Sequence, residues 1–128
     1  MPTVFIDTNI FFLYHDGINV FEELRFLVPG NLKLTVSTGV LYELKSLNKN
    51  ETNLIFKIIK TYEEKGQLNV IESDNYVDRW LTNYINNLEE DQKKDFIVCT
   101  NDLELKQKLK NKKIRIISPK SSGHLDFV

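Results

Sequence analysis

The sequence predicts an α/β fold in which helices cover a doubly wound parallel sheet. Short β-branched runs alternate along the chain with amphipathic segments, a pattern typical of strands joined by crossover helices. Residues 1–128 fit a single domain with one core, and no repeat or linker interrupts them. In such sheets ligands bind outside the carboxyl ends of the strands, near the switch in strand order, so polar residues at strand ends are informative.

The first half of the chain supplies two expected strands. Thr3–Ile6 is a short apolar run, and Leu32–Val36 is a second run that follows the turn sequence Pro29-Gly30-Asn31. A helix is expected after the second strand, with a cap near Ser37 or Thr38. Its apolar stripe consists of Val40, Leu44 and Leu47.

The second half supplies three more expected strands, which are Leu68–Ile71, Phe96–Cys99 and Ile114–Ile117. The first and the last of these follow the turn sequences Lys65-Gly66-Gln67 and Asn111-Lys112-Lys113. The helical segments between them carry Val77, Leu81, Tyr84, Ile85 and Leu88, and then Leu103–Lys110. Residues 119–128 are predicted to form a loose C-terminal tail, whose apolar end either docks back on the fold or acts as an interaction tail.

Composition narrows the class of protein. Lys and Arg total 17 and Asp and Glu 18, a formal net charge of −1, so any nucleic-acid binding must rest on a local patch. The single Cys99 lies in an apolar run, which excludes a disulfide framework and favours a buried thiol in the cytoplasm. No apolar run reaches the roughly 20 residues of a membrane span, so we expect a soluble, unprocessed protein without a membrane partner.

Two acidic residues follow expected strands directly. Asp7 comes after Thr3–Ile6, and Asp102 closes the turn that follows Phe96–Cys99. Each would lie at the carboxyl edge of the sheet, where a ligand is expected. The alternative for both is an ordinary helix N-cap, and the local sequence leaves that choice open.

Two further acids lie on inward-tending helix faces. Glu43 falls about 40° from Leu47 at ~100° per residue, and Asp78 falls within about 20° of Ile85. The alternative for Glu43 is an amphipathic side chain whose head reaches solvent. Asp74 lies one turn before Asp78 and is a reserve candidate. Its alternative is a favourable interaction of its negative charge with the positive N-terminal end of the helix dipole. Whether Asp74 or Glu104 also contributes stays open.

The four acids predict a metal site if they converge. Carboxylates near a core lose solvation and repel one another. A bound cation offsets both of these free-energy costs. Hard oxygen ligands without a Cys or His cluster suit Mg²⁺ or Mn²⁺. Such a metal lowers the pKa of bound water and stabilises a leaving oxygen, so hydrolysis of a phosphodiester is the chemistry we expect. The predicted catalytic and metal-binding residues are Asp7, Glu43, Asp78 and Asp102.

At these residues the chain resembles the PIN domain family over nearly its whole length. Phe5-Ile6-Asp7-Thr8-Asn9 looks like the family's opening acidic motif, and Val36–Leu44 looks like the second. Ile97–Leu105 contains Thr100-Asn101-Asp102, which looks like the Thr-Asn-Asp motif. Tyr76–Leu81 resembles a segment that often has two adjacent acids after a small residue. Here the small residue is Val77, and Arg79 takes the place of the second acid.

The resemblance implies a three-layer α/β/α sandwich with a five-stranded, mostly parallel sheet. It also implies an endoribonuclease that uses Mg²⁺ or Mn²⁺ to cut single-stranded or loop RNA, leaving 5′-phosphate and 3′-hydroxyl ends. Within the family, a short single-domain chain such as this one is similar to rRNA-processing nucleases and to VapC-like toxins. The Asp-Thr-Asn opening and the stretch Asn19–Leu24 favour the rRNA-processing kind. Besides RNA, the resemblance implies two possible partners, which are a small antitoxin protein and a second copy of this chain in a homodimer. Asn9 and Thr100 are expected either to orient ligands or to cap turns.

Other readings of the sequence compete with this one. A basic stretch after Asp102 either tracks an RNA backbone or is a solvated helix and turn; it comprises Lys106, Lys108, Lys110, Lys112, Lys113 and Arg115. Tyr14, Trp80 and Tyr84 could stack on bases, although Trp80 and Tyr84, at i, i+4 spacing, are more typical of the core or a dimer surface. A receiver-like domain would need an Asp where Glu72-Ser73 ends the third strand, and a metal-independent ribonuclease would use His15 and His124. A non-catalytic PIN-like binding module is the remaining alternative.

Overall fold

The computed structural model describes residues 1–47 and 50–128 and shows one central sheet flanked by helices on both faces. The sheet order is β3-β2-β1-β4-β5-β6, with the first five strands parallel and β6 antiparallel to β5. The strands are β1 (Thr3–Ile6), β2 (Lys33–Ser37), β3 (Asn69–Ile71), β4 (Phe96–Cys99), β5 (Arg115–Pro119) and β6 (Leu125–Phe127).

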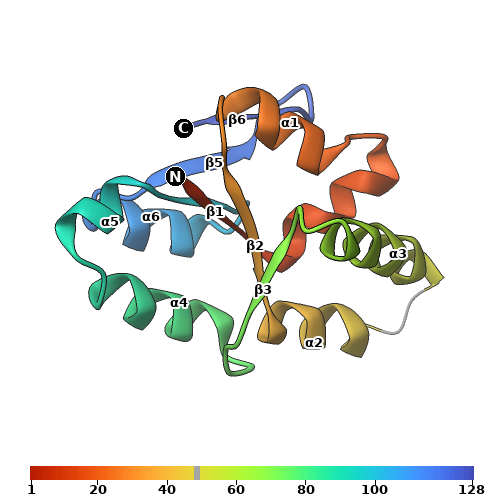
Figure 1. Ribbon diagram of the computed structural model, residues 1–128, viewed down its shortest axis with the longest axis horizontal. Coiled ribbons are helices and arrows are strands. Elements are labelled where there is room, and N and C mark those ends of the chain that lie inside the picture. The colour runs from red at the N-terminus through yellow and green to blue at the C-terminus, as the bar shows by residue number, and fades with distance from the viewer. Residues whose placement is uncertain (48–49) are drawn as a thin grey trace.

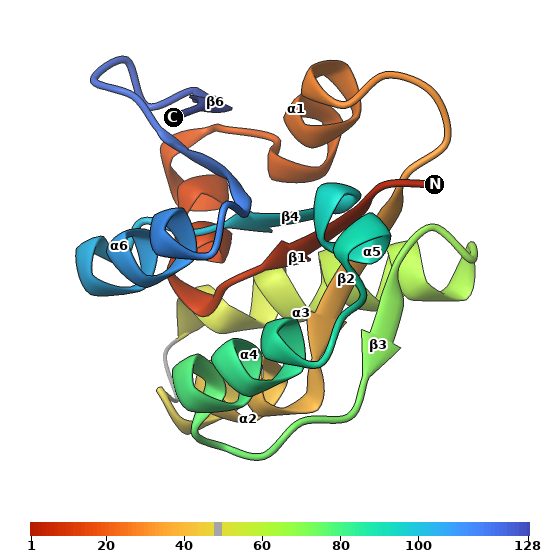
Figure 2. The ribbon, with the colours of Figure 1, turned by 90° about the vertical axis from the view of Figure 1, so that its left-hand side faces the viewer.

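The helices form the two outer layers of the sandwich. They are the 3₁₀ helix η1 (Thr8–Asp16), α1 (Val20–Leu27), α2 (Thr38–Ser46), α3 (Asn50–Glu64), α4 (Val77–Asn86), α5 (Glu90–Lys94) and α6 (Leu103–Asn111). Helices α4, α5 and α6 cover one face of the sheet, and η1, α1, α2 and α3 lie on the other (Figure 1). The turned view in Figure 2 places α4, α5 and α6 in front of the strands. In the described ranges, no helix is long and apolar enough to cross a membrane.

The middle of the sheet is the most deeply buried part of the fold. Every residue of β4 is buried, and Val4, Phe5 and Ile6 of β1 have no exposed surface. Both strands therefore read as continuous apolar runs, as expected for parallel strands covered on both faces. Because β2 and β3 extend to one side of β1 and β4 lies on its other side, the strand order switches between β1 and β4. A ligand site is expected at the carboxyl ends of these two strands.

The fold class predicted from the sequence is confirmed, but the predicted number of five strands is wrong. The sixth strand, β6, lies within residues 119–128, which the sequence predicted as a loose tail. Leu125 is 5% exposed and pairs with Pro119, while the backbone N–H of Leu125 donates to Glu23 Oε1 at 2.8 Å. The strand escaped prediction because it has three residues and is held by its partners β5 and α1 rather than by its own pattern.

Candidate functional site

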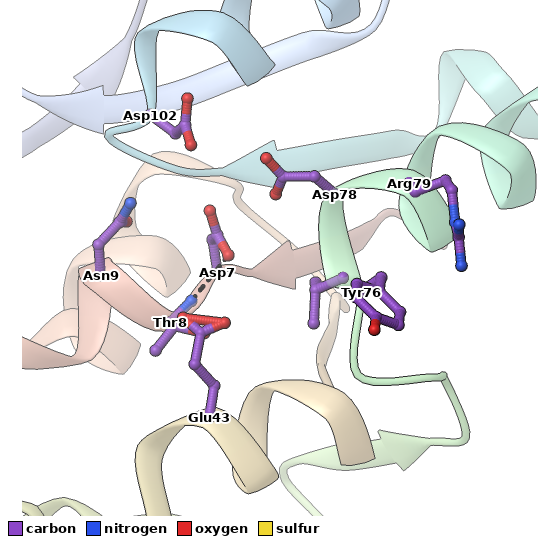
Figure 3. Close-up of a pocket in the computed structure, with 9 residues that line it drawn as sticks. Asp7, Thr8, Asn9, Glu43, Tyr76, Asp78, Arg79 and Asp102 are labelled. Carbon is purple, nitrogen blue, oxygen red and sulfur yellow. Dashed lines mark hydrogen bonds between the residues drawn. The ribbon is translucent and has the colours of Figure 1, made fainter. Parts of the chain in front are cut away.

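A pocket of roughly 430 Å³ opens at the carboxyl edge of the sheet. All four acids that the sequence singled out line it, although they come from four separate segments of the chain (Figure 3). The residues around it are Asp7, Thr8, Asn9, Glu43, Tyr76, Val77, Asp78, Arg79 and Asp102. The expected convergence of the acids on one pocket is therefore present in the fold.

Asp7 is the most buried acid of the pocket, with 6% of its surface exposed. It is the N-cap of η1, and its Oδ1 accepts a hydrogen bond from the backbone N–H of Thr8 at 2.9 Å. Its Oδ2 accepts a hydrogen bond from the hydroxyl of Thr100 at 2.7 Å. The backbone N–H of Asp7 donates to the carbonyl of Cys99 at 3.0 Å, which fixes the end of β1 against the end of β4. The position of this carboxylate is thus set by both central strands.

The turn after β4 places Asp102 beside Asp7. The Thr100 hydroxyl, fully buried, donates to Asp7 and accepts from the backbone N–H of Asp102 at 3.1 Å. Asp102 is the N-cap of α6, with Oδ1 accepting from the backbone N–H of Leu105 at 3.1 Å. Asn9 supports the same turn, since its Oδ1 accepts from the backbone N–H of Asn101 at 3.2 Å. Thr100 therefore both orients a pocket acid and holds a turn, the two roles that the sequence left as alternatives.

Asp78 and Glu43 are brought together by a tight contact between α2 and the segment before α4. The Thr38 hydroxyl donates to the carbonyl of Ser73 at 3.1 Å and accepts from the backbone N–H of Ser73 at 3.0 Å. The backbone N–H of Gly39 donates to Ser73 Oγ at 3.0 Å. Asp78 follows in the first turn of α4 and is half-buried, whereas Glu43 is exposed. Glu43 thus matches the amphipathic alternative in its exposure while still lining the pocket.

The acids of the pocket act on one another electrostatically. Burial raises the pKa of the Asp7 carboxyl above its usual range, the hydrogen bonds from Thr100 and Thr8 oppose this, and the charges of Glu43 and Asp102 add to it. Burial also raises the pKa of Asp78, and Asp7 and Asp102 raise it further. A pocket in which like charges raise the pKa values of two acids favours a cation.

The chemistry of the donor set fits Mg²⁺ or Mn²⁺. Four carboxylates line the pocket, and none of the described residues around it is Cys or His. In the ranges 1–47 and 50–128, no three His, Cys, Asp or Glu side chains are grouped so that they could hold a metal ion as they stand.

Comparison with known proteins assigns the family. The family described as the PIN like domain matches residues 4–121 of this chain. The chain belongs to the PIN-like domain family. The solved structure of the PIN domain endonuclease Utp24 is similar to this PIN-like domain with a TM-score of 0.77 and 24% sequence identity, and the match covers 98% of this chain and 90% of that chain. That likeness supports the fold. A search among curated proteins finds no match.

Several candidates lie outside the pocket of this PIN-like domain. Asp74 does not line it; its Oδ1 accepts from the backbone N–H of Tyr76 at 2.8 Å. Glu104 does not line it either, although its charge helps to raise the pKa of Asp78. His15 stacks on Phe12, and His124 Nδ1 lies 2.6 Å from Glu23 Oε2. Neither histidine lines the acidic pocket, so the structure does not bring them together with the four acids.

The aromatic residues considered as stacking platforms are largely structural. Trp80 lies 6.1 Å from the ring of Phe5 and 5.1 Å from that of Tyr84, so it packs α4 onto the sheet. The Tyr14 hydroxyl accepts from the backbone N–H of Phe21 at 3.2 Å. For Trp80 these contacts match the core alternative that the sequence left open, and the hydroxyl of Tyr14 is engaged within the fold.

The basic stretch divides into residues with different surroundings. Lys112 Nζ donates to Asn86 Oδ1 at 2.6 Å, and the guanidinium of Arg115 lies 5.6 Å from the centroid of the Phe127 ring. The charge of Lys108, by contrast, lowers the pKa of Asp78, so this lysine acts on the pocket. The members of the stretch therefore differ in their contacts, and Lys108 is the one whose charge acts on an acid of the pocket.

Tyr76 and Arg79 are among the pocket residues that were not identified from the sequence as functional candidates. Tyr76 is 69% exposed and Arg79 is exposed, and both lie at the rim beside Asp78 (Figure 3). The sequence did contain a signal, because Arg79 replaces the second acid of the family segment. Tyr76 carried none, since its exposure depends on where α4 begins.

Proposed function

We propose that this PIN-like domain is a metal-dependent endoribonuclease that hydrolyses phosphodiester bonds of single-stranded or loop RNA. The observation that carries the proposal is the convergence of four carboxylates from four segments on one pocket at the carboxyl edge of the sheet. Membership of the PIN-like family and the fold shared with a PIN domain endonuclease support it. The raised pKa values of Asp7 and Asp78 add support, because perturbed acids in a cleft are typical of functional sites.

In this proposal Asp7, Glu43, Asp78 and Asp102 hold Mg²⁺ or Mn²⁺, which activates water and stabilises the charge on the leaving oxygen. The chain's own residues hold the carboxylates in place. Thr100 orients Asp7 through its hydroxyl, and the first turn of α6 fixes Asp102. The exposed Glu43 side chain can turn toward a cation without breaking core packing. The expected products carry 5′-phosphate and 3′-hydroxyl ends.

We place the protein among rRNA-processing nucleases of the cytoplasm, because of the Asp7-Thr8-Asn9 opening and the reduced, buried Cys99. The alternative biological role is that of a VapC-like toxin, which would add a small antitoxin protein as a partner. A homodimer is compatible with either role. Purification of the protein from its own cells separates the two roles, since ribosomal precursors would accompany a processing nuclease and a small DNA-binding protein would accompany a toxin.

A second candidate function is a non-catalytic module that binds RNA or protein. Arg79 favours it, because this cation of the pocket stands where the family segment often has a second acid, so the chain lacks one carboxylate that would attract a metal. Such a module would bind RNA without cutting it. The cleavage experiment below separates the two functions.

The deciding experiment is cleavage of a structured RNA pool by the purified protein with Mn²⁺, with EDTA, and by an Asp7→Asn variant. We expect cleavage with Mn²⁺, none with EDTA, and a loss of at least about 100-fold in the variant, because Asp7 is the most buried acid of the site. Asp91→Asn, an exposed acid of α5, is the matched control and should cut like the wild type. Cleavage that survives EDTA would contradict the metal mechanism, and binding without any cleavage would favour the module.

A further inference from the structure

Tyr76 exposes an aromatic ring at the rim of the acidic pocket. It is 69% exposed, whereas most aromatic side chains of this chain pack against one another or against the core. It is the N-cap residue of α4 and makes no side-chain capping hydrogen bond. A large aromatic surface left in water contributes little to stability, so its place beside the pocket suggests contact with a ligand.

Arg79 gives this rim its positive charge. In the part of the chain that the structure describes, it is the only cationic residue that lines the pocket. Its guanidinium lies 4.9 Å from the centroid of the Tyr76 ring, within the range of a cation–π contact. Figure 3 shows the Arg79 side chain on the side of Asp78 that faces away from Asp7 and Asp102, so the aromatic–cation pair lies at the rim of the pocket and not among its carboxylates.

Asp74 orients the pair without fixing it. Its Oδ1 holds the backbone of Tyr76, and its Oδ2 lies 3.9 Å from a guanidinium nitrogen of Arg79. That ion pair is long, and its side chains are 69% and 50% exposed, so it contributes little to stability. The guanidinium can therefore exchange Asp74 for a phosphate group at small cost, while the ring stays in place.

We propose that Tyr76 and Arg79 form a nucleotide subsite in which the base next to the scissile bond of a single-stranded RNA stacks on Tyr76 and an adjacent phosphate contacts Arg79. This inference rests on the proposed nuclease function and names residues that hold its substrate. A polyanion must approach a pocket lined by four carboxylates, and a cation at the rim offsets that repulsion. An exposed ring accepts any unpaired base, whereas bases in a duplex are already stacked.

The test is binding of a short, fluorescently labelled single-stranded oligoadenylate, measured by anisotropy in EDTA and again in Ca²⁺. We expect Tyr76→Ala to weaken binding by roughly 5- to 100-fold, the range for loss of one stacked base, and Tyr76→Phe to bind like the wild type. Arg79→Ala should weaken binding and lower the slope of log affinity against log salt by about 1. Arg79→Lys should keep most of the affinity, and Arg79→Asp should lose the most.

Arg115→Ala is the matched control. Arg115 also lies over an aromatic ring, that of Phe127, but at the amino end of β5, on the edge of the sheet opposite the pocket. Removing it takes away the same charge and the same kind of contact, so an equal loss of affinity would show that net charge alone matters and would overturn the subsite. A duplex of the same sequence should show no dependence on Tyr76, and equal dependence would overturn the stacking contact.

Other outcomes separate this inference from the proposed function. Binding that depends on Tyr76 and Arg79 without any Mn²⁺-dependent cleavage would leave the subsite standing and remove the nuclease. Cleavage with a KM unchanged in Tyr76→Ala and Arg79→Ala would leave the nuclease standing and overturn the subsite. We expect both variants to raise KM more than they lower kcat. Wild-type protein that binds no oligoadenylate in either condition would also overturn the subsite.

Discussion

Thr100 connects two of the four acids through one buried hydroxyl group. It donates to Asp7 Oδ2 at 2.7 Å and accepts from the backbone N–H of Asp102 at 3.1 Å. Because the residue has no exposed surface, water cannot replace either partner without a change in the fold. A single side chain thus sets the spacing between the ends of β1 and β4.

We expect Thr100→Val to reduce both stability and cleavage. Valine keeps the shape but leaves the N–H of Asp102 without its acceptor, at a cost of about 1–3 kcal/mol in the free energy of unfolding. Loss of the group that orients Asp7 should lower kcat by roughly 10- to 100-fold. Urea unfolding and single-turnover cleavage measure the two effects. Thr100→Ser keeps the hydroxyl group and should therefore keep most of the stability and of kcat. The control Thr35→Val, at a buried threonine of β2, should leave kcat unchanged. A Thr100→Val enzyme with wild-type kcat would contradict the role.

Residue patterns predicted the acids better than they predicted their surroundings. For Asp7 and Asp102, the sequence could not choose between a helix cap and a pocket acid, and the structure shows that each residue caps a helix and lines the pocket. A helix cap and a pocket acid both need a carboxylate shortly after a strand, so the local sequence cannot distinguish these two roles. The roles as metal ligands stay a prediction. The sequence marked Arg79 only as a departure from the family segment, and the place of Tyr76 at the pocket depends on the tertiary position of α4, which local residue patterns do not encode.

At the scale of elements, the pocket depends on how closely α2 approaches the segment before α4. A Cβ atom at Gly39 would overlap the backbone oxygen of Asp74 and come within 2.6 Å of Ser73 Oγ and 3.0 Å of Val77 Cγ2. Only glycine therefore allows the hydrogen bonds between Thr38, Gly39 and Ser73 to form at their present lengths. This contact sets the separation of Glu43 from Asp78.

We expect Gly39→Ala to force these two elements apart. Overpacking at a contact made largely by backbone should cost roughly 1–3 kcal/mol in the free energy of unfolding. Cleavage should fall as well, because Asp78 would move relative to the acids on β1 and β4. Thermal unfolding and cleavage with Mn²⁺ measure the effects, with Lys45→Ala on the exposed side of α2 as the control. If Gly39→Ala were as stable as the wild type, the backbone around Asp74 would be able to move aside at little cost, and the proposed role of this close contact would be contradicted.

The elements themselves were largely visible in the sequence. Thr3–Ile6 and Phe96–Cys99 were predicted with the observed bounds because both are buried on both faces and read as continuous apolar runs. The bounds of the other three predicted strands differ from the observed ones by one or two residues at their ends. β6 was missed, since its pairing with β5 and the hydrogen bond from Leu125 to Glu23 come from distant parts of the chain.

At the scale of the whole molecule, the fold accepts a local cost in order to assemble the pocket. The acids come from segments between residues 7 and 102, and the parallel topology brings their strand ends to one edge. The sequence predicted this convergence because carboxyl ends of parallel strands share an edge. It could not predict that β1 lies beside β4, because strand order depends on how all the crossovers pack.

We expect Asp78→Asn to stabilise the protein in EDTA while it abolishes cleavage. The Asp78 carboxylate is partly desolvated and repelled by Asp7 and Asp102, and solvent screens part of this repulsion, so a neutral amide of the same shape should raise the free energy of unfolding by at most about 1 kcal/mol. Thermal unfolding at neutral pH should show a rise of roughly 3–5 °C for a gain near 1 kcal/mol in a chain of this size. Asp91→Asn, which removes an exposed carboxylate, should show no rise. A lower melting temperature for Asp78→Asn would contradict the repulsion.

The same series should reverse when Mn²⁺ replaces EDTA. A ligand that binds only the folded state stabilises it by mass action, so the wild type should gain melting temperature with Mn²⁺ concentration. Asp78→Asn removes one carboxylate of the pocket and should gain much less. An equal gain in both proteins would mean that the cation binds away from Asp78. The crossing of the two melting temperatures would show that the charge repulsion that lowers stability without a cation is the property that lets the pocket bind one.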